Sequence, residues 1–189
     1  MIETLLVSTG VIALSEIGDK TQLLALVLTS RFRRPVPIIL GIALATVLNH
    51  TVAAWAGARI ADAMPEAVLR WILGLLFLAM AIRALIPERI EDEEKAGRGA
   101  WGNAFLATAI SFFLVEIGDK TQIATAMLAA HFHSIGPVIA GTTVGMLLAD
   151  VPAVIFGHAA GKRFDLRWIR YAAAGIFVLL GLLTIFNLR

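Results

Sequence analysis

The sequence predicts an all-α integral membrane protein with six transmembrane helices, which form two inverted three-helix repeats. Three observations lead to this fold class: an excess of apolar residues, six long apolar segments, and a seven-residue motif that occurs twice. Of the 189 residues, 59% are hydrophobic and 16% are charged, and the mean hydropathy is +0.84. Soluble domains contain about 25% charged and about 45–50% apolar residues. The apolar excess is therefore too large for one soluble core.

Six apolar segments reach the length of about 17–25 residues that a membrane-spanning helix needs. In chain order they are Thr4–Ser30, Val36–Ala58, Ala67–Ile86, Asn103–Ala130, Ile135–His158 and Trp168–Phe186. Pro35, Pro65 and Pro87 lie at the boundaries of the first three, and the charged stretch Glu88–Gly99 follows the third. The N-terminal stretch lacks the basic region of a signal peptide, so we expect the first segment to be retained as a span.

The internal repeat relates the two halves of the chain. The motif Glu-Ile-Gly-Asp-Lys-Thr-Gln occupies residues 16–22 and again residues 116–122, and the offset of 100 residues also pairs Gly41 with Gly141 and Pro37 with Pro137. The predicted divisions are a first three-helix repeat (1–87), a charged cytoplasmic linker (88–102) and a second repeat (103–189). Because three spans are an odd number, the second repeat must enter the membrane from the opposite side. Inverted repeats in transporters place the substrate site near the midplane.

The distribution of lysine and arginine predicts the orientation, because cytoplasmic loops carry an excess of them. One side of the predicted membrane receives Arg31, Arg33, Arg34, Arg83, Arg89, Lys95, Arg98, Lys162, Arg163, Arg167 and Arg170. The other side receives only Arg59, Arg70 and Arg189. The richer side is expected to be cytoplasmic, which places both termini on the opposite side.

Each motif puts a glutamate, an aspartate and a lysine inside a predicted span. A charge at the centre of a spanning helix costs about 2.5–3.5 kcal/mol, so these groups must pair with each other, with water or with an ion. In a continuous helix Glu16, Asp19 and Gln22 share one face, and Lys20 can reach Glu16. Gly18 permits close helix approach or a local break. Structural salt bridges such as Glu16–Lys20 are the plainer interpretation, but buried ion pairs stabilise poorly compared with apolar packing.

When the two motif faces meet, they form a candidate metal site made of oxygen ligands. The metal-ligand candidates are Glu16, Asp19, Gln22, Glu116, Asp119 and Gln122, with Lys20, Thr21, Lys120 and Thr121 in support. Four carboxylates and two protonated lysines carry a formal charge of minus two, which a divalent cation would neutralise. Oxygen ligands suit magnesium, calcium or manganese rather than copper or zinc, and the motif does not choose among the three.

Polar residues in the second and fifth predicted spans are further candidates. Asn49 and His50 lie in the second span, and the repeat offset relates His50 to Asp150 in the fifth. They would either support metal or proton binding or form ordinary interhelical hydrogen bonds, which are worth about 0.6 kcal/mol each. The chain contains no cysteine, which excludes disulfides, thiolate metal sites and cysteine nucleophiles.

The doubled motif in a short six-span chain resembles the Gdt family of calcium/manganese–proton antiporters, which includes bacterial manganese exporters and Golgi cation transporters. The resemblance covers nearly the whole chain. It implies that Glu16, Asp19, Glu116 and Asp119 bind the cation, and that threonine and glutamine of each motif support them. The compact length resembles the prokaryotic form, which implies a multi-pass protein of a prokaryotic inner (plasma) membrane. The cation, Mn²⁺ or Ca²⁺, would be the substrate, and no cofactor is expected.

The function expected on these grounds is secondary active export of a divalent cation, manganese before calcium, in exchange for protons by alternating access. Protons would compete with the metal for the same carboxylates. A divalent-cation channel without proton coupling is the main alternative. A structural scaffold would tolerate neutral motifs. An intramembrane hydrolase would need a protease-like histidine motif, which the sequence lacks, so no enzymatic activity is expected. Nucleic acid is not expected as a partner, because the basic residues lie beside apolar segments.

Overall fold

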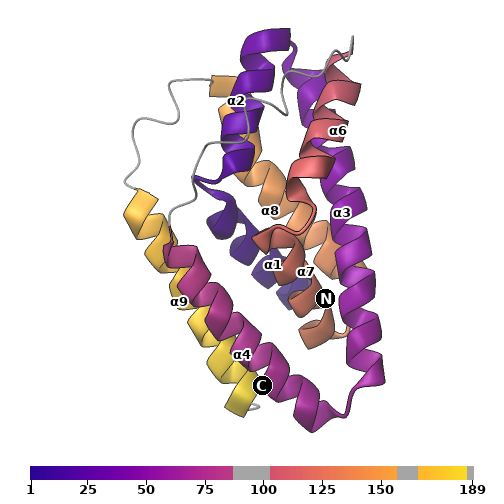
Figure 1. Ribbon diagram of the computed structural model, residues 1–189, viewed down its shortest axis with the longest axis vertical. Helices are drawn as coiled ribbons and strands as arrows, with labels where there is room; N and C mark the ends of the chain where they lie inside the picture. Colours follow the sequence, from indigo (N-terminus) through magenta and orange to yellow (C-terminus); the bar gives the residue numbers. More distant parts are fainter. Residues whose placement is uncertain (87–102, 157–165, 187–189) are drawn as a thin grey trace.

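The computed structural model describes residues 1–86, 103–156 and 166–186, and every regular element in these ranges is an α-helix. The predicted linker (88–102) and the end of the fifth predicted span at His158 lie outside them. Figure 1 shows the arrangement of the helices. They are α1 (Ile2–Glu16), α2 (Lys20–Phe32), α3 (Pro35–Ala63), α4 (Glu66–Leu85), α6 (Ala104–Glu116), α7 (Lys120–Phe132), α8 (Ile135–Phe156) and α9 (Leu166–Phe186).

The first and fourth predicted spans are each two helices rather than one, so the predictions of continuous helices over Thr4–Ser30 and Asn103–Ala130 are wrong. The break falls on the motif in both halves. Gly18 and Gly118 adopt φ angles of 84° and 76°, in the left-handed region that residues with a Cβ rarely adopt. Asp19 and Asp119 then act as the N-caps of α2 and α7. The chain therefore changes direction where continuous helical faces were predicted.

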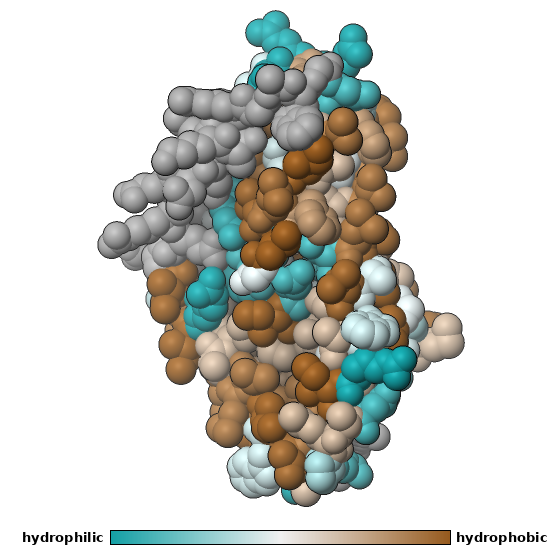
Figure 2. Space-filling view, turned by 45° about the vertical axis from the view of Figure 1, so that its right-hand side comes forward, coloured by the Kyte–Doolittle hydropathy of each residue, from teal (hydrophilic) through white to brown (hydrophobic). Residues whose placement is uncertain are grey.

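The other predicted spans correspond to single helices. Three helices are long and apolar enough to cross a membrane: α3, α4 and the Ile135–Ile155 part of α8. The remaining apolar helices are shorter, namely α6 and the Tyr171–Phe186 part of α9. Large apolar side chains such as Trp55, Leu76 and Leu148 are exposed, and Figure 2 shows hydrophobic residues over much of the surface in view. A surface of this kind is expected where lipid, rather than water, surrounds the protein.

The two halves make equivalent helix crossings. Helix α1 packs on α8 as α6 packs on α3, and α4 packs on α9. A Cβ at Gly41 would lie 2.8 Å from the backbone oxygen of Phe105, and a Cβ at Gly141 would lie 2.6 Å from that of Leu5. Each pair of residues is related to the other by the repeat offset. In Figure 1, α1 and α2 run upward while α6 and α7 run downward, and both termini lie in the lower half of the view.

Candidate metal centre

The helix breaks bring carboxylates from both motifs into the interior. Glu16, Asp19, Glu116 and Asp119 are all at most 3% exposed. Glu16, Asp19 and Asp119 each offer an oxygen that lies within 4.8 Å of the others, and we call these three residues the carboxylate cluster. Three carboxylates at this separation can share one hard divalent cation, because calcium, magnesium and manganese prefer oxygen ligands.

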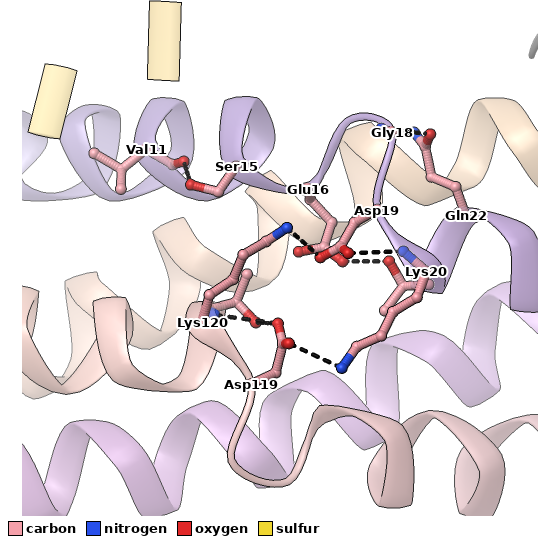
Figure 3. Close-up of polar contacts among 11 residues, drawn as sticks. Val11, Ser15, Glu16, Gly18, Asp19, Lys20, Gln22, Asp119 and Lys120 are labelled. Atoms are coloured by element: carbon pink, nitrogen blue, oxygen red, sulfur yellow. Dashed lines mark hydrogen bonds and ion pairs between the residues drawn. The ribbon is translucent and has the colours of Figure 1, made fainter. Parts of the chain in front are cut away.

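The glutamine of each motif closes the turn that positions these carboxylates. The Gly18 N–H donates to Gln22 Oε1 at 2.9 Å, and the Gly118 N–H donates to Gln122 Oε1 at 2.8 Å. Gln22 Nε2 also donates to the backbone oxygen of Ala149 in α8, at 2.8 Å. Figure 3 shows Gln22 directed toward Gly18 and away from the carboxylate cluster. The predicted role of Gln22 and Gln122 as metal ligands therefore differs from their position here, where both oxygens stabilise the helix breaks.

The motif lysines form ion pairs between the two motifs. Lys20 Nζ lies 2.9 Å from Asp119 Oδ1, and Lys120 Nζ lies 2.6 Å from Asp19 Oδ2. Figure 3 shows the two lysines on opposite sides of the carboxylates, each extending toward the aspartate of the other motif. The sequence suggested pairing within a motif, between Glu16 and Lys20. It missed this reciprocal exchange, because local spacing carries no information about contacts between residues a hundred positions apart.

The two glutamates have different surroundings although the motifs are identical. The Thr21 hydroxyl donates to Glu16 Oε1, whereas the Thr121 hydroxyl donates to Asp119 Oδ2 at 3.3 Å. Glu116 lies outside the carboxylate cluster, and its Oε1 accepts a hydrogen bond from Thr46 at 3.5 Å. Glu16 Oε2 and Glu116 Oε2 are buried without a hydrogen-bond partner among the described residues. Each glutamate therefore keeps one oxygen available for a cation or a proton.

The candidates in α3 and α8 divide into two kinds. Asn49 Nδ2 donates to the backbone oxygen of Phe113 at 3.2 Å, which is the ordinary interhelical hydrogen bond. His50 and Asp150 are 0% exposed. Neither ring nitrogen of His50 has a hydrogen-bond partner within the described part of the chain, whereas the Asp150 carboxyl lies beside the hydroxyl of Thr21. Asp150 lies within electrostatic range of Asp19.

Sequence reasoning missed one residue at the site, the Thr46 that contacts Glu116. The sequence could have indicated Thr46, because this residue precedes His50 by four positions and therefore lies on the same face of α3. A polar residue on the face of a spanning helix that also carries a histidine is a candidate for the same site.

Broken apolar helices with buried, paired acidic groups at the breaks are typical of membrane transporters. Comparison with protein families identifies which kind. The family model described as "Divalent cation/proton antiporter GDT1" matches residues 4–92 and 104–189, and the chain belongs to this family. Transport, not catalysis, is therefore its class of activity, and the family resemblance seen in the motif is confirmed.

Relatives from several organisms match most of this chain. A Vibrio cholerae protein named "Putative manganese exporter" is 47% identical over 188 residues, which are 98% of this chain and 92% of the relative. A GDT1-like protein of Synechocystis is 30% identical and covers 89% of each chain. The Arabidopsis thaliana protein named "GDT1-like protein 3" is 28% identical over 93% of this chain and 68% of its own. No solved structure matches the chain.

Proposed function

We propose that this protein exports manganese from the cytoplasm in exchange for protons. Membership of the divalent cation/proton antiporter family supports the reaction type. The name of the Vibrio cholerae relative supports manganese as the substrate, since that relative shares 47% of its aligned residues with this chain. Calcium is the second candidate substrate, because the same oxygen ligands suit it.

The observation that carries the proposal is the approach of three carboxylates from two motifs to within 4.8 Å of one another. Glu16, Asp19 and Asp119 would be the central ligands of the cation. Glu116 would join them in one state of the transport cycle, because its free oxygen is buried near the same helix breaks. Asp150 adds negative charge beside Asp19 and would raise the affinity of the site for a divalent cation.

The proposed mechanism is alternating access between two inverted three-helix repeats, with the α1–α2 and α6–α7 pairs each counted as one span. Rocking of one repeat against the other would expose the cluster to one side of the membrane at a time. Ionised carboxylates would bind the metal from the cytoplasm. On the other side protons would compete for the same oxygens, release the metal and return with the empty site.

The proposed orientation has both termini outside the cytoplasm of a prokaryotic cell, with the protein in the plasma membrane. Exposed arginines support it. Arg33 and Arg34 lie between α2 and α3, at the end of the molecule opposite the α3–α4 connection that Figure 1 shows at the bottom. Loops rich in arginine remain in the cytoplasm during insertion.

Metal flux into proteoliposomes under an imposed pH gradient tests the function, with manganese and calcium in parallel. Glu16→Gln and Glu116→Gln are expected to abolish gradient-driven flux. Glu3→Gln provides a matched control, because Glu3 lies on α1 but is exposed, and it should transport like the wild-type protein. Flux in the wild type that ignores the pH gradient would indicate a channel. Flux that survives both buried substitutions would reject the carboxylates as the transport site.

A further inference from the structure

The reciprocal ion pairs occupy the aspartates that a metal would use. Lys120 Nζ and the backbone N–H of Lys20 engage the two oxygens of Asp19, at 2.6 Å and 2.7 Å. Lys20 Nζ engages Oδ1 of Asp119 at 2.9 Å, and Thr121 donates to Oδ2. Each carboxylate oxygen keeps a second lone pair, but a cation bound there would lie beside a lysine ammonium group, and the repulsion between the two cations favours displacement of the lysine.

The position of the lysines is not explained by the stability of their helices. Lys20 and Lys120 are the first residues of α2 and α7. The N-terminus of a helix carries a partial positive charge, so a cationic side chain there is unfavourable. Both lysines nonetheless occupy this position, and Lys120 is 9% exposed. The ion pairs with the aspartates of the opposite motif offset this unfavourable position.

We propose that Lys20 and Lys120 are internal counter-cations that compete with the transported metal for Asp19 and Asp119. This inference rests on the proposed function, because it takes the carboxylate cluster as the metal site. Two ammonium groups carry the same charge as one divalent cation. Metal binding that moves both lysines away from the aspartates leaves the charge that these carboxylates face unchanged, and metal release lets the lysines return. The lysines thereby keep Asp19 and Asp119 neutralised while the site is empty.

The two lysines differ in how easily a metal can displace them from their aspartates. The Lys20 side chain is 26% exposed, whereas the Lys120 side chain is 11% exposed and makes the shorter ion pair. Once displaced from its aspartate, the ammonium group of Lys20 can be hydrated more readily than that of Lys120, because the Lys20 side chain is already more exposed. Lys20 is therefore the first of the two to be displaced, and Lys120 is the stronger competitor.

Titration calorimetry with MnCl₂ on the purified full-length protein tests the competition. Lys20→Gln and Lys120→Gln are each expected to lower the Kd, by about tenfold for Lys120→Gln and by less for Lys20→Gln. Lys20→Arg and Lys120→Arg keep the positive charge and should bind manganese with the wild-type Kd or more weakly. If the wild type binds no manganese, the proposed function itself fails. If the wild type binds and the glutamine variants bind no more tightly, only the lysine inference fails.

A second measurement needs no variant and separates displacement from simple charge repulsion. The wild-type protein is labelled with an amine-acylating reagent with and without MnCl₂, and mass spectrometry compares Lys20 with the exposed N-terminal amine of Met1. Manganese is expected to raise Lys20 labelling at least about threefold relative to Met1, because the ammonium group leaves Asp119. Unchanged or reduced labelling would mean that Lys20 stays in place when metal binds, which would overturn the proposal.

Discussion

The repeat offset relates His50 in α3 to Asp150 in α8, and the difference between these two side chains makes the centre asymmetric. Both side chains are fully buried. An ionisable side chain buried inside a membrane protein is costly, and such residues usually serve a function. Asp150 lies within electrostatic range of Glu16, Asp19 and Glu116, so its charge acts on the carboxylates of both motifs.

Asp150→Asn tests this role by removing the charge at nearly constant shape. We expect the Kd for manganese to rise on the order of tenfold, or about 1.4 kcal/mol, because the site loses one negative charge. Asp62→Asn is the matched control, since Asp62 lies on α3 but is exposed. An unchanged Kd in Asp150→Asn, measured by titration calorimetry, would assign Asp150 a purely structural role.

At the scale of the elements, the helix breaks depend on a small set of local contacts that both halves share. The backbone N–H of Asp19 donates to the backbone oxygen of Glu16 at 3.0 Å, and the equivalent backbone bond joins Asp119 to Glu116 at 3.0 Å. The glutamine of each motif then binds the glycine N–H. These contacts use residues within a single motif, so an identical sequence produces an identical turn in both halves.

Gly118→Ala tests whether the break requires a glycine. An added Cβ at Gly118 would meet no atom within 4 Å, so the only penalty is the left-handed backbone conformation. This costs about 1–2 kcal/mol, and we expect a lower melting temperature and weaker manganese transport.

Gly136→Ala is the control for this substitution. Its added Cβ would also meet no atom within 4 Å, but Gly136 lies in the first turn of α8. Alanine favours a helix over glycine by up to about 1 kcal/mol, so the melting temperature should stay constant or rise. If both variants melted alike, the strain at Gly118 would be refuted.

At the scale of the whole molecule, the sequence predicted an all-helical membrane protein correctly and the geometry of the centre less well. Apolar length predicted the four unbroken helices. The repeat offset paired Gly41 with Gly141, and the structure places both at equivalent helix crossings. The break at Gly18 was only one of two alternatives, because apolar residues continue on both sides of the motif and a single glycine fits a helix or a turn. The reciprocal lysine pairs and the unequal surroundings of Glu16 and Glu116 depend on packing between halves, which local patterns do not contain.

The inverted topology can be tested by cysteine labelling, because the natural chain contains no cysteine. Met64→Cys and Arg34→Cys place single thiols at exposed positions at opposite ends of α3. In intact cells, a membrane-impermeant maleimide should label Met64→Cys, whereas Arg34→Cys should react only after permeabilisation. His133→Cys, at the end of α7, should behave like Met64→Cys if the second repeat is inverted. Labelling of His133→Cys only after permeabilisation would contradict the inversion.

The exchange of lysines between the halves also has a consequence for biogenesis. Asp19 receives its partner from Lys120, which the ribosome adds about a hundred residues later. At synthesis rates of about 5–20 residues per second, the first half waits roughly 5–20 s before that partner exists. During this interval its acidic turn has no lysine from the second half, so the nascent chain needs water or the insertion machinery around that turn until translation of the second half brings the compensating charge.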